Sequence, residues 1–195
     1  MLPISKCLRI ENRNFTILIA GLRLKRLTEE TVGIVLERLS KSKIPVLLLD
    51  ARGIWSIRHI LIATHMALRS WIRKENIARK LPLEIMLYAS ATREIDKAVK
   101  LLGLKPGLTE IVACIIVEGM GSTEELMREL MELLDEELII EVDDSLLEPG
   151  PLKEKLISWF SLTEEELKAT YARDRNEAIE KCIIARMAYL NISKL

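Results

Sequence analysis

The 195-residue chain contains no glutamine, only two histidines and few aromatic residues, which make up 4% of it. Glu, Lys, Arg, Ile and Leu are abundant instead. Proteins of organisms that live at high temperature avoid thermolabile amides and favour charged residues. The composition therefore predicts an archaeal or thermophilic source.

Cysteines and long apolar runs are also scarce. Cys7, Cys114 and Cys182 lie far apart and outside any Cys-x-x-Cys pair, which excludes a disulfide framework and a zinc knuckle. No apolar run approaches the roughly 18 to 20 residues of a membrane span, and the start, MLPISKCLRIENR, has no cleavable hydrophobic region. With 49% hydrophobic and 30% charged residues, we expect a cytoplasmic protein that forms a single domain over residues 1–195.

The formal net charge is zero, but the charges are segregated along the chain. Residues 52–80 contain seven basic residues and one acid, whereas residues 118–148 contain twelve acids and one base. A neutral total argues against a general nucleic-acid coat protein. The segregation indicates that one part of the surface attracts phosphate and another repels it.

Short apolar runs and capping patterns predict the secondary structure. Strands are expected at 15–20, 44–49, 83–89 and 111–117, with a short edge strand at 138–142. Helices are expected at 29–39, 57–74 and 122–134, with Thr28, Ser56 and Ser122 as their N-terminal caps. Further helices are expected at 92–102 and 152–160, with two more that begin at Thr163 and Asp174. Residues 143–151 are a predicted linker. The pattern predicts a mixed α/β (α+β) fold, with a central sheet of about four strands flanked by helices and a helical C-terminal tail.

The two histidines, His59 and His65, lie in the predicted helix 57–74. Six positions separate them by roughly 240° around a helix, so both rings cannot bind one metal ion. A zinc-binding helix places two histidines four residues apart with a carboxylate between them. We therefore expect no metal site, and only His59 is placed for a function.

No other motif supports a cofactor or a catalytic residue. Gly119-Met-Gly121 lacks the third glycine and the ribose-binding acid of a dinucleotide fold, and there is no Walker lysine. Cys114 lies in an apolar strand, where a thiolate is costly, and Ser56, the serine nearest to His59 in the sequence, is placed to cap the helix. We expect no cofactor, although a small α/β enzyme that uses His59 with Cys114 or a carboxylate stays open as an alternative.

The C-terminal helix has more apolar surface than one packed face requires. One stripe at helical spacing comprises Ile179, Ile183, Met187 and Leu190, and a second comprises Ala178, Cys182, Ala185 and Tyr189, with Ile184 off the first. One stripe suffices for packing on one domain, so the excess indicates a partner. A helix inserted between core elements and a homodimer through this helix are open alternatives.

Three stretches resemble a known family. The histidine helix has the form His-(Ile/Leu)-x-x-Ala-x-x-x-Ala, with His59, Ala63 and Ala67. The stretch LEIMLYASATREIDKAVKLLGLKPG contains, in the family's order, Glu84, Ser90, Arg93, Ile95, Ala98 and Gly103. Residues 160–167 and the closing ARMAYLNI are similar to the family's end. The chain thus resembles the kinase-binding accessory subunit of the KEOPS complex, the PRPK-binding protein family, over most of residues 44–118 and 152–192.

The chain departs from the family pattern at a few positions. Ala91 stands where members often have Gly, Glu94 stands where they have Gln or Asn, and the acidic stretch before Pro151 is longer. These departures concern local contacts more than the fold.

The resemblance implies a non-catalytic, regulatory role in the threonylcarbamoyladenosine modification of certain transfer RNAs. Members that resemble this chain bind the N-terminal lobe of the small atypical kinase of KEOPS, which acts as an ATPase, and help to recruit tRNA by its 3′ CCA end. We therefore expect this kinase and the tRNA 3′ end as partners, with a possible homodimer of the chain alone.

The sequence also suggests which residues bind each partner. For the kinase we expect contacts from the last helix, at Ile179, Ile183, Ile184, Met187 and Leu190. For tRNA the basic stretch and its surroundings are the candidates, at Arg52, Arg58, His59, Arg69, Arg73 and Arg93. Arginines supply charge for phosphates, whereas His59 and Arg93 line or support a pocket for an unstacked base.

Overall fold

The computed structural model describes residues 3–192, and it divides into two compact units that are each built from two stretches of sequence. Unit 1 comprises residues 1–51 and 103–147, and unit 2 comprises residues 52–102 and 148–195. Residues 1–2 and 193–195, the two ends of the expected single domain, lie outside the described residues. The predicted linker 143–151 contains one of the three points at which the chain passes between units.

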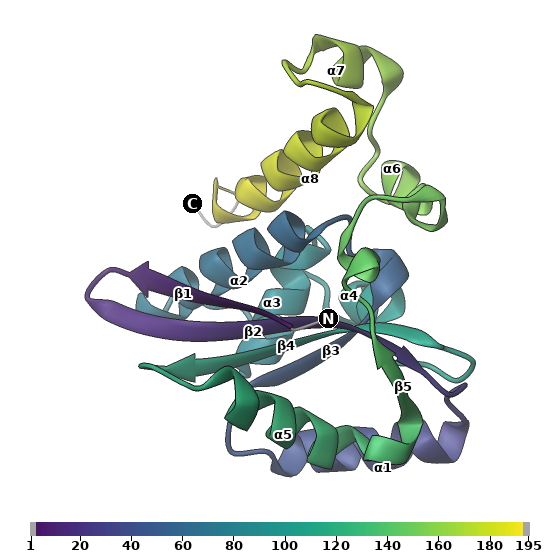
Figure 1. Cartoon of the computed structure of the whole chain (residues 1–195). Coiled ribbons are helices and arrows are strands. Elements are labelled where there is room, and N and C mark those ends of the chain that lie inside the picture. Colours follow the sequence, from purple (N-terminus) through teal and green to yellow (C-terminus); the bar gives the residue numbers. More distant parts are fainter. Residues whose placement is uncertain (1–2, 193–195) are drawn as a thin grey trace. The chain divides into compact units, whose positions relative to one another are not determined.

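Unit 1 is built on an antiparallel sheet (Figure 1). The strand order is β1 (Ile4–Ile10), β2 (Arg13–Leu24), β4 (Glu110–Glu118) and β3 (Val46–Asp50), and β5 (Ile139–Val142) pairs with the end of β2. The sequence predicted four of these five strands. It missed β1, because ISKCLRI is an exposed edge strand in which polar and charged residues interrupt the apolar ones.

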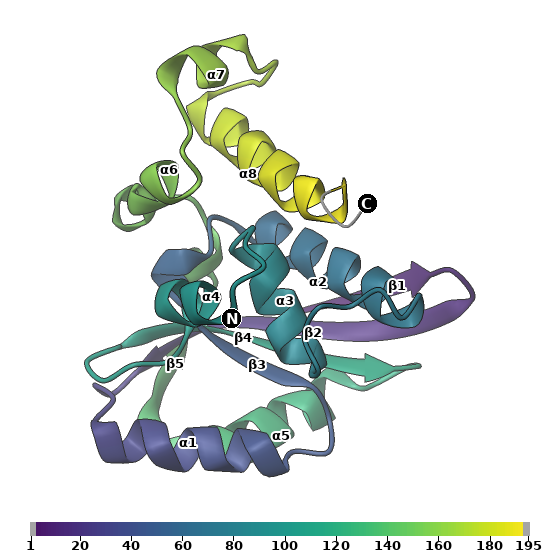
Figure 2. The same ribbon diagram turned by 180° about the vertical axis from the view of Figure 1, so that it is seen from behind.

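Helices α1 (Glu29–Lys41) and α5 (Thr123–Leu134) cover the same face of the sheet, as both ribbon views show (Figures 1 and 2). Their N-termini are capped as predicted, because Thr28 Oγ1 accepts from Thr31 N and Ser122 Oγ accepts from Glu125 N, both at 3.1 Å. The core between sheet and helices includes Leu22, Val35, Leu48, Ile115 and Leu130. Unit 1 is thus a two-layer α/β structure.

The strand predicted at 83–89 is wrong, because these residues form most of helix α3 (Leu81–Ala89). LEIMLYA is apolar apart from Glu84, and such a run has the same appearance in a buried strand and in a buried helix. Pro82 lies in the first turn, where a helix tolerates proline. Seven of the nine residues of α3 are buried, which explains the missing helical periodicity.

Unit 2 is helical. Besides α3 it contains α2 (Ile57–Ile72), α4 (Ile95–Leu102), α6 (Lys155–Trp159), α7 (Glu164–Ala169) and α8 (Arg175–Ile192). Ser56, Thr163 and Asp174 accept backbone N–H groups at the helix starts, as their capping patterns predict. Within residues 3–192 no helix is long and apolar enough to cross a membrane.

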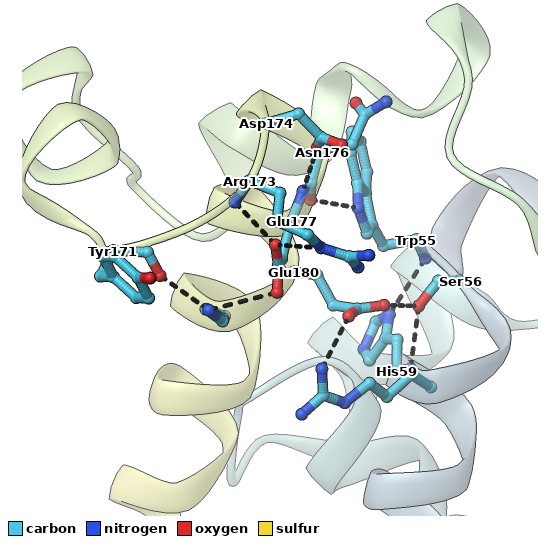
Figure 3. A network of polar contacts seen from close by, with 11 residues as sticks. Trp55, Ser56, His59, Tyr171, Arg173, Asp174, Asn176, Glu177 and Glu180 are labelled. Atoms are coloured by element: carbon cyan, nitrogen blue, oxygen red, sulfur yellow. Dashed lines mark hydrogen bonds and ion pairs between the residues drawn. The ribbon is translucent and has the colours of Figure 1, made fainter.

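A network of polar contacts joins the start of α8 to the start of α2 (Figure 3). The Ser56 hydroxyl, which caps α2, donates to the Glu180 carboxylate, and the Trp55 indole donates to the carbonyl of Asn176 at 3.2 Å. The Glu180 carboxylate therefore lies at the positive end of α2. This network fixes the direction in which α8 runs along α2 and α3.

Candidate functional site

A pocket of about 550 Å³ lies at the C-terminal end of α2. It is lined by Met66, Arg69, Ser70, Arg73, Glu75, Asn76, Ile77, Arg93 and Asn191. Three of the predicted RNA-binding arginines thus converge here, although Arg93 comes from the turn before α4. Sequence reasoning missed Asn76, Ile77 and Asn191, since none belongs to a charged or periodic pattern. We call this pocket the arginine pocket.

The segment 74–77 turns sharply to form one wall of the arginine pocket. Lys74 follows α2 with φ +59°, the left-handed conformation common after a helix end. The Glu75 N–H then bonds back to the carbonyl of Ser70 at 2.9 Å. This turn directs Asn76 and Ile77 into the pocket lining.

The fully buried carboxylate of Glu84 holds this wall in place. One oxygen accepts the backbone N–H groups of Ile77 and Ala78, at 2.9 and 2.8 Å, and the other accepts the Ser70 hydroxyl at 3.3 Å. A buried carboxylate with several donors is stabilised in its place, whereas one without donors is very costly. Glu84 therefore positions the pocket without lining it.

The lining of the arginine pocket carries three arginines and one carboxylate, that of Glu75. The positive charge also reaches His65, an exposed residue one turn before Arg69. Partial burial of the ring, followed by the charge of Arg69, lowers the pKa of His65. The pocket is therefore suited to an anionic ligand such as a phosphate.

The other three predicted RNA-binding residues do not line this pocket. Arg52 is half-buried in a short 3₁₀-helix, and Arg58 is exposed, with its guanidinium 3.4 Å from Glu180. His59 is completely buried. Their contact with RNA stays a prediction, and the structure gives it less support than it gives for Arg69, Arg73 and Arg93.

Both ring nitrogens of His59 are used within the protein. Nδ1 accepts the backbone N–H of Trp55 at 3.0 Å, and Nε2 donates to the carbonyl of Ala89 at 2.8 Å. Burial, with a smaller effect of the Lys153 charge, lowers the pKa of His59 to about 4, although its bond to Ala89 acts in the opposite direction. The ring is therefore neutral at pH 7 and joins the start of α2 to the end of α3, which favours a structural role over a catalytic one.

The predicted kinase-binding residues of α8 lie mostly inside unit 2. Ile179, Ile183, Met187 and Leu190 are at most 6% exposed, and α8 packs against α2, α3 and α7. Ile184 is half-buried, as is Ala188, and Ala185 is exposed. Since residues three and four positions apart share a helix face, Ala188 lies beside both Ala185 and Ile184, and the three residues form an apolar outer face of α8. This outer face is available to a partner.

Within the part of the chain that the structure describes, no three His, Cys, Asp or Glu residues are grouped so as to hold a metal ion. Cys114 is completely buried in β4 and Cys182 is buried in α8, whereas Cys7 is exposed on β1.

Comparison with known proteins gives these observations a context. Residues 24–191 match the family model described as kinase binding protein CGI-121. The chain belongs to the CGI-121 family. It is also 34% identical over 110 residues to regulatory protein Cgi121 of Methanocaldococcus jannaschii. That match covers 56% of this chain and 65% of the relative, slightly less than two thirds of the relative's length. The residues that line the arginine pocket and the outer face of α8 all lie inside the CGI-121 match.

Proposed function

We propose that this CGI-121 protein is a regulatory subunit of the KEOPS tRNA-modification assembly, which binds the small atypical kinase and holds the 3′ CCA end of tRNA. The observation that carries the RNA part is the convergence of Arg69, Arg73 and Arg93 on one pocket. The family match carries the kinase part.

The arginine pocket has the chemistry that a single-stranded RNA end requires. Guanidinium groups bind phosphate oxygens with two parallel hydrogen bonds, and unstacked bases need apolar surface and amide groups for recognition. Here Met66 and Ile77 supply apolar surface, and Asn76 and Asn191 carry amides. Asn191 is itself fixed, because its side-chain oxygen accepts the Tyr88 hydroxyl at 2.5 Å.

The outer face of α8 suits the kinase. Ile184, Ala185 and Ala188 form an apolar strip with short side chains, against which another protein can pack closely. The buried residues of the same helix, Met187 among them, hold the strip in place. We therefore expect the kinase contact at Ile184 and its neighbours, and we expect the remaining predicted residues to support the helix.

The RNA part is tested by the affinity for tRNA with and without its CCA end. Intact tRNA should bind at least about tenfold more tightly, and Arg69→Glu, Arg73→Glu or Arg93→Glu should remove the difference. Arg9→Glu, an equal charge change at an exposed arginine of β1, serves as the control. Equal affinities of the wild type for both RNAs would rule out end recognition.

The kinase part is tested by size-exclusion chromatography with light scattering, using the KEOPS kinase of the same organism. The wild type should co-elute with the kinase, and Ile184→Glu should elute alone, since it places a charge in an apolar interface. Leu36→Glu is the matched control, because Leu36 is an exposed apolar residue of α1. A folded wild type that never forms a complex would contradict the proposal.

A further inference from the structure

A second pocket of unit 2, of about 460 Å³, is built differently from the arginine pocket. Its lining includes Ala91, Thr92, Trp159, Arg186, Tyr189 and Leu190. Tyr189 is 65% exposed, an unusual state for a large ring that borders a pocket. Neither the family match nor the charge pattern assigns a function to this pocket, which we call the tyrosine pocket.

The two pockets are lined by neighbouring residues of the same two segments. Ala91 and Thr92 line the tyrosine pocket, and the next residue, Arg93, lines the arginine pocket. Likewise Tyr189 and Leu190 line one pocket, and Asn191 lines the other. Both pockets therefore border the same two short segments, residues 91–93 and 189–191.

The groups around the tyrosine pocket are held in fixed positions. The Trp159 indole donates to the carbonyl of Ser90 at 2.9 Å. Arg186 forms a two-bond ion pair with Glu166, at 2.7 and 2.8 Å, and also donates to the carbonyl of Phe160. Lys97 at the pocket pairs with Glu94 at 2.7 Å. Because Arg186 and Lys97 both have carboxylate partners, the tyrosine pocket offers a ligand the surface of an aromatic ring more than a net charge.

We propose that the tyrosine pocket is a subsite for one unstacked nucleobase of the same RNA end, which stacks on the Tyr189 ring while the arginine pocket holds adjacent phosphates. This inference rests on the proposed RNA binding. Aromatic side chains beside a basic groove are the usual means of holding single-stranded nucleic acid, because every base has a face that stacks. The division between a charged pocket and an aromatic one matches the alternation of phosphate and base along a strand.

The test uses the full chain and an RNA hairpin with a single-stranded 3′ CCA tail, whose bases are replaced by abasic residues one at a time. Tyr189→Ala should weaken binding about tenfold, and Tyr189→Phe should bind as the wild type does. At one tail position the abasic substitution should weaken binding to the wild type but not to Tyr189→Ala, since both changes remove the same stack. Tyr171→Ala, at another exposed tyrosine, is the control.

Each contrary result has a distinct meaning. If Tyr189→Ala binds the tail normally while Arg69→Glu does not, the tyrosine subsite is disproved and the arginine pocket stands. If the wild type does not bind the tail at all, both proposals fall. If Tyr189→Ala keeps its RNA affinity but no longer co-elutes with the kinase, the tyrosine pocket serves a protein partner, and the base subsite is disproved.

Discussion

His59 shows how a single residue can have the chemistry of one role and the surroundings of another. An imidazole in a helix near a basic stretch suggests catalysis or ligand binding. In the folded chain its two nitrogens instead join Trp55 to Ala89, and its ring forms a T-shaped pair with Phe160, with 6.0 Å between ring centroids. The neutral form is the one that makes both hydrogen bonds.

This state of His59 predicts a loss of stability in weak acid. Its pKa is about 4 when folded and about 6.5 when unfolded, so the unfolded chain takes up the proton first as the pH falls. The neutral His59 ring makes its full contribution to the free energy of unfolding above pH 6.5. Between pH 6.5 and 4 this contribution is lost, which lowers the free energy of unfolding by about 3 kcal/mol. Urea unfolding at several pH values measures it. His65→Gln should keep this loss and His59→Gln should remove it, and an unchanged pH profile in His59→Gln would contradict the assignment.

Glu84 provides a second prediction for a single residue. Glu84→Gln keeps the size of the side chain but removes its charge, so the hydrogen bonds from Ile77, Ala78 and Ser70 lose the strength that a charged acceptor gives. We expect a loss of about 2 kcal/mol in the free energy of unfolding. Glu94→Gln, at an exposed ion pair with Lys97, should change it by less than about 1 kcal/mol. Chemical denaturation compares the two variants, and equal stabilities would show that Glu84 does not hold the loop.

At the scale of elements, α3 and α8 are both apolar on more than one face, for different reasons. Helix α3 is enclosed, with seven of its nine residues buried. Helix α8 has one buried face and one outer face, the latter with Ile184, Ala185 and Ala188. Surplus apolar character in a sequence therefore has two explanations, and only the packing of neighbouring elements decides between them.

The two faces of α8 predict opposite effects of the same substitution. Met187→Glu places a carboxylate at a completely buried position, so it should unfold the protein or destabilise it by more than about 4 kcal/mol. Ile184→Glu, on the outer face, should cost less than about 2 kcal/mol and leave a folded protein. Thermal unfolding followed by circular dichroism distinguishes them. A folded Met187→Glu with wild-type stability would mean that α8 does not pack as the structure shows.

At the scale of the whole molecule, the neutral total divides between the two units. Unit 1 carries 11 Lys and Arg against 17 Asp and Glu, a formal charge of −6, and unit 2 carries 18 against 12, a formal charge of +6. Both pockets that we propose bind RNA lie in the positive unit. The linear segregation of charge in the sequence thus becomes a segregation between folded units, which favours RNA on unit 2.

This charge distribution predicts a modest salt dependence. If three arginines neutralise three phosphates of a single strand, the logarithm of the binding constant should fall with that of the salt concentration with a slope of about −2. Removal of one arginine by Arg93→Ala should reduce the slope by about 0.7, and Arg9→Ala should leave it unchanged. Fluorescence anisotropy with the tail RNA at several salt concentrations measures it. A slope near zero would exclude phosphate contacts in the arginine pocket.

The light-scattering measurement also tests the homodimer alternative. In the absence of the kinase, a monomer leaves the outer face of α8 open for that partner, whereas a dimer that Ile184→Glu dissociates would mean that two copies share this face.

The sequence by itself determined the local features. Caps at Thr28, Ser56 and Ser122 depend on short-range hydrogen bonds, and the strands β2, β3 and β4 depend on short apolar runs. Both kinds of feature can be predicted because they depend on residues that are close together in the sequence. The family motifs likewise depend on order and spacing along the chain.

Only the tertiary structure decided what distant residues do together. It made 83–89 a helix, buried His59 and most of the α8 stripe, and brought Arg93 to Arg69 and Arg73. Each of these outcomes depends on packing and hydrogen bonds between segments far apart in sequence, such as Glu84 with Ile77 or Tyr88 with Asn191. Composition and periodicity carry no information about such pairs, because the same pattern fits several packings.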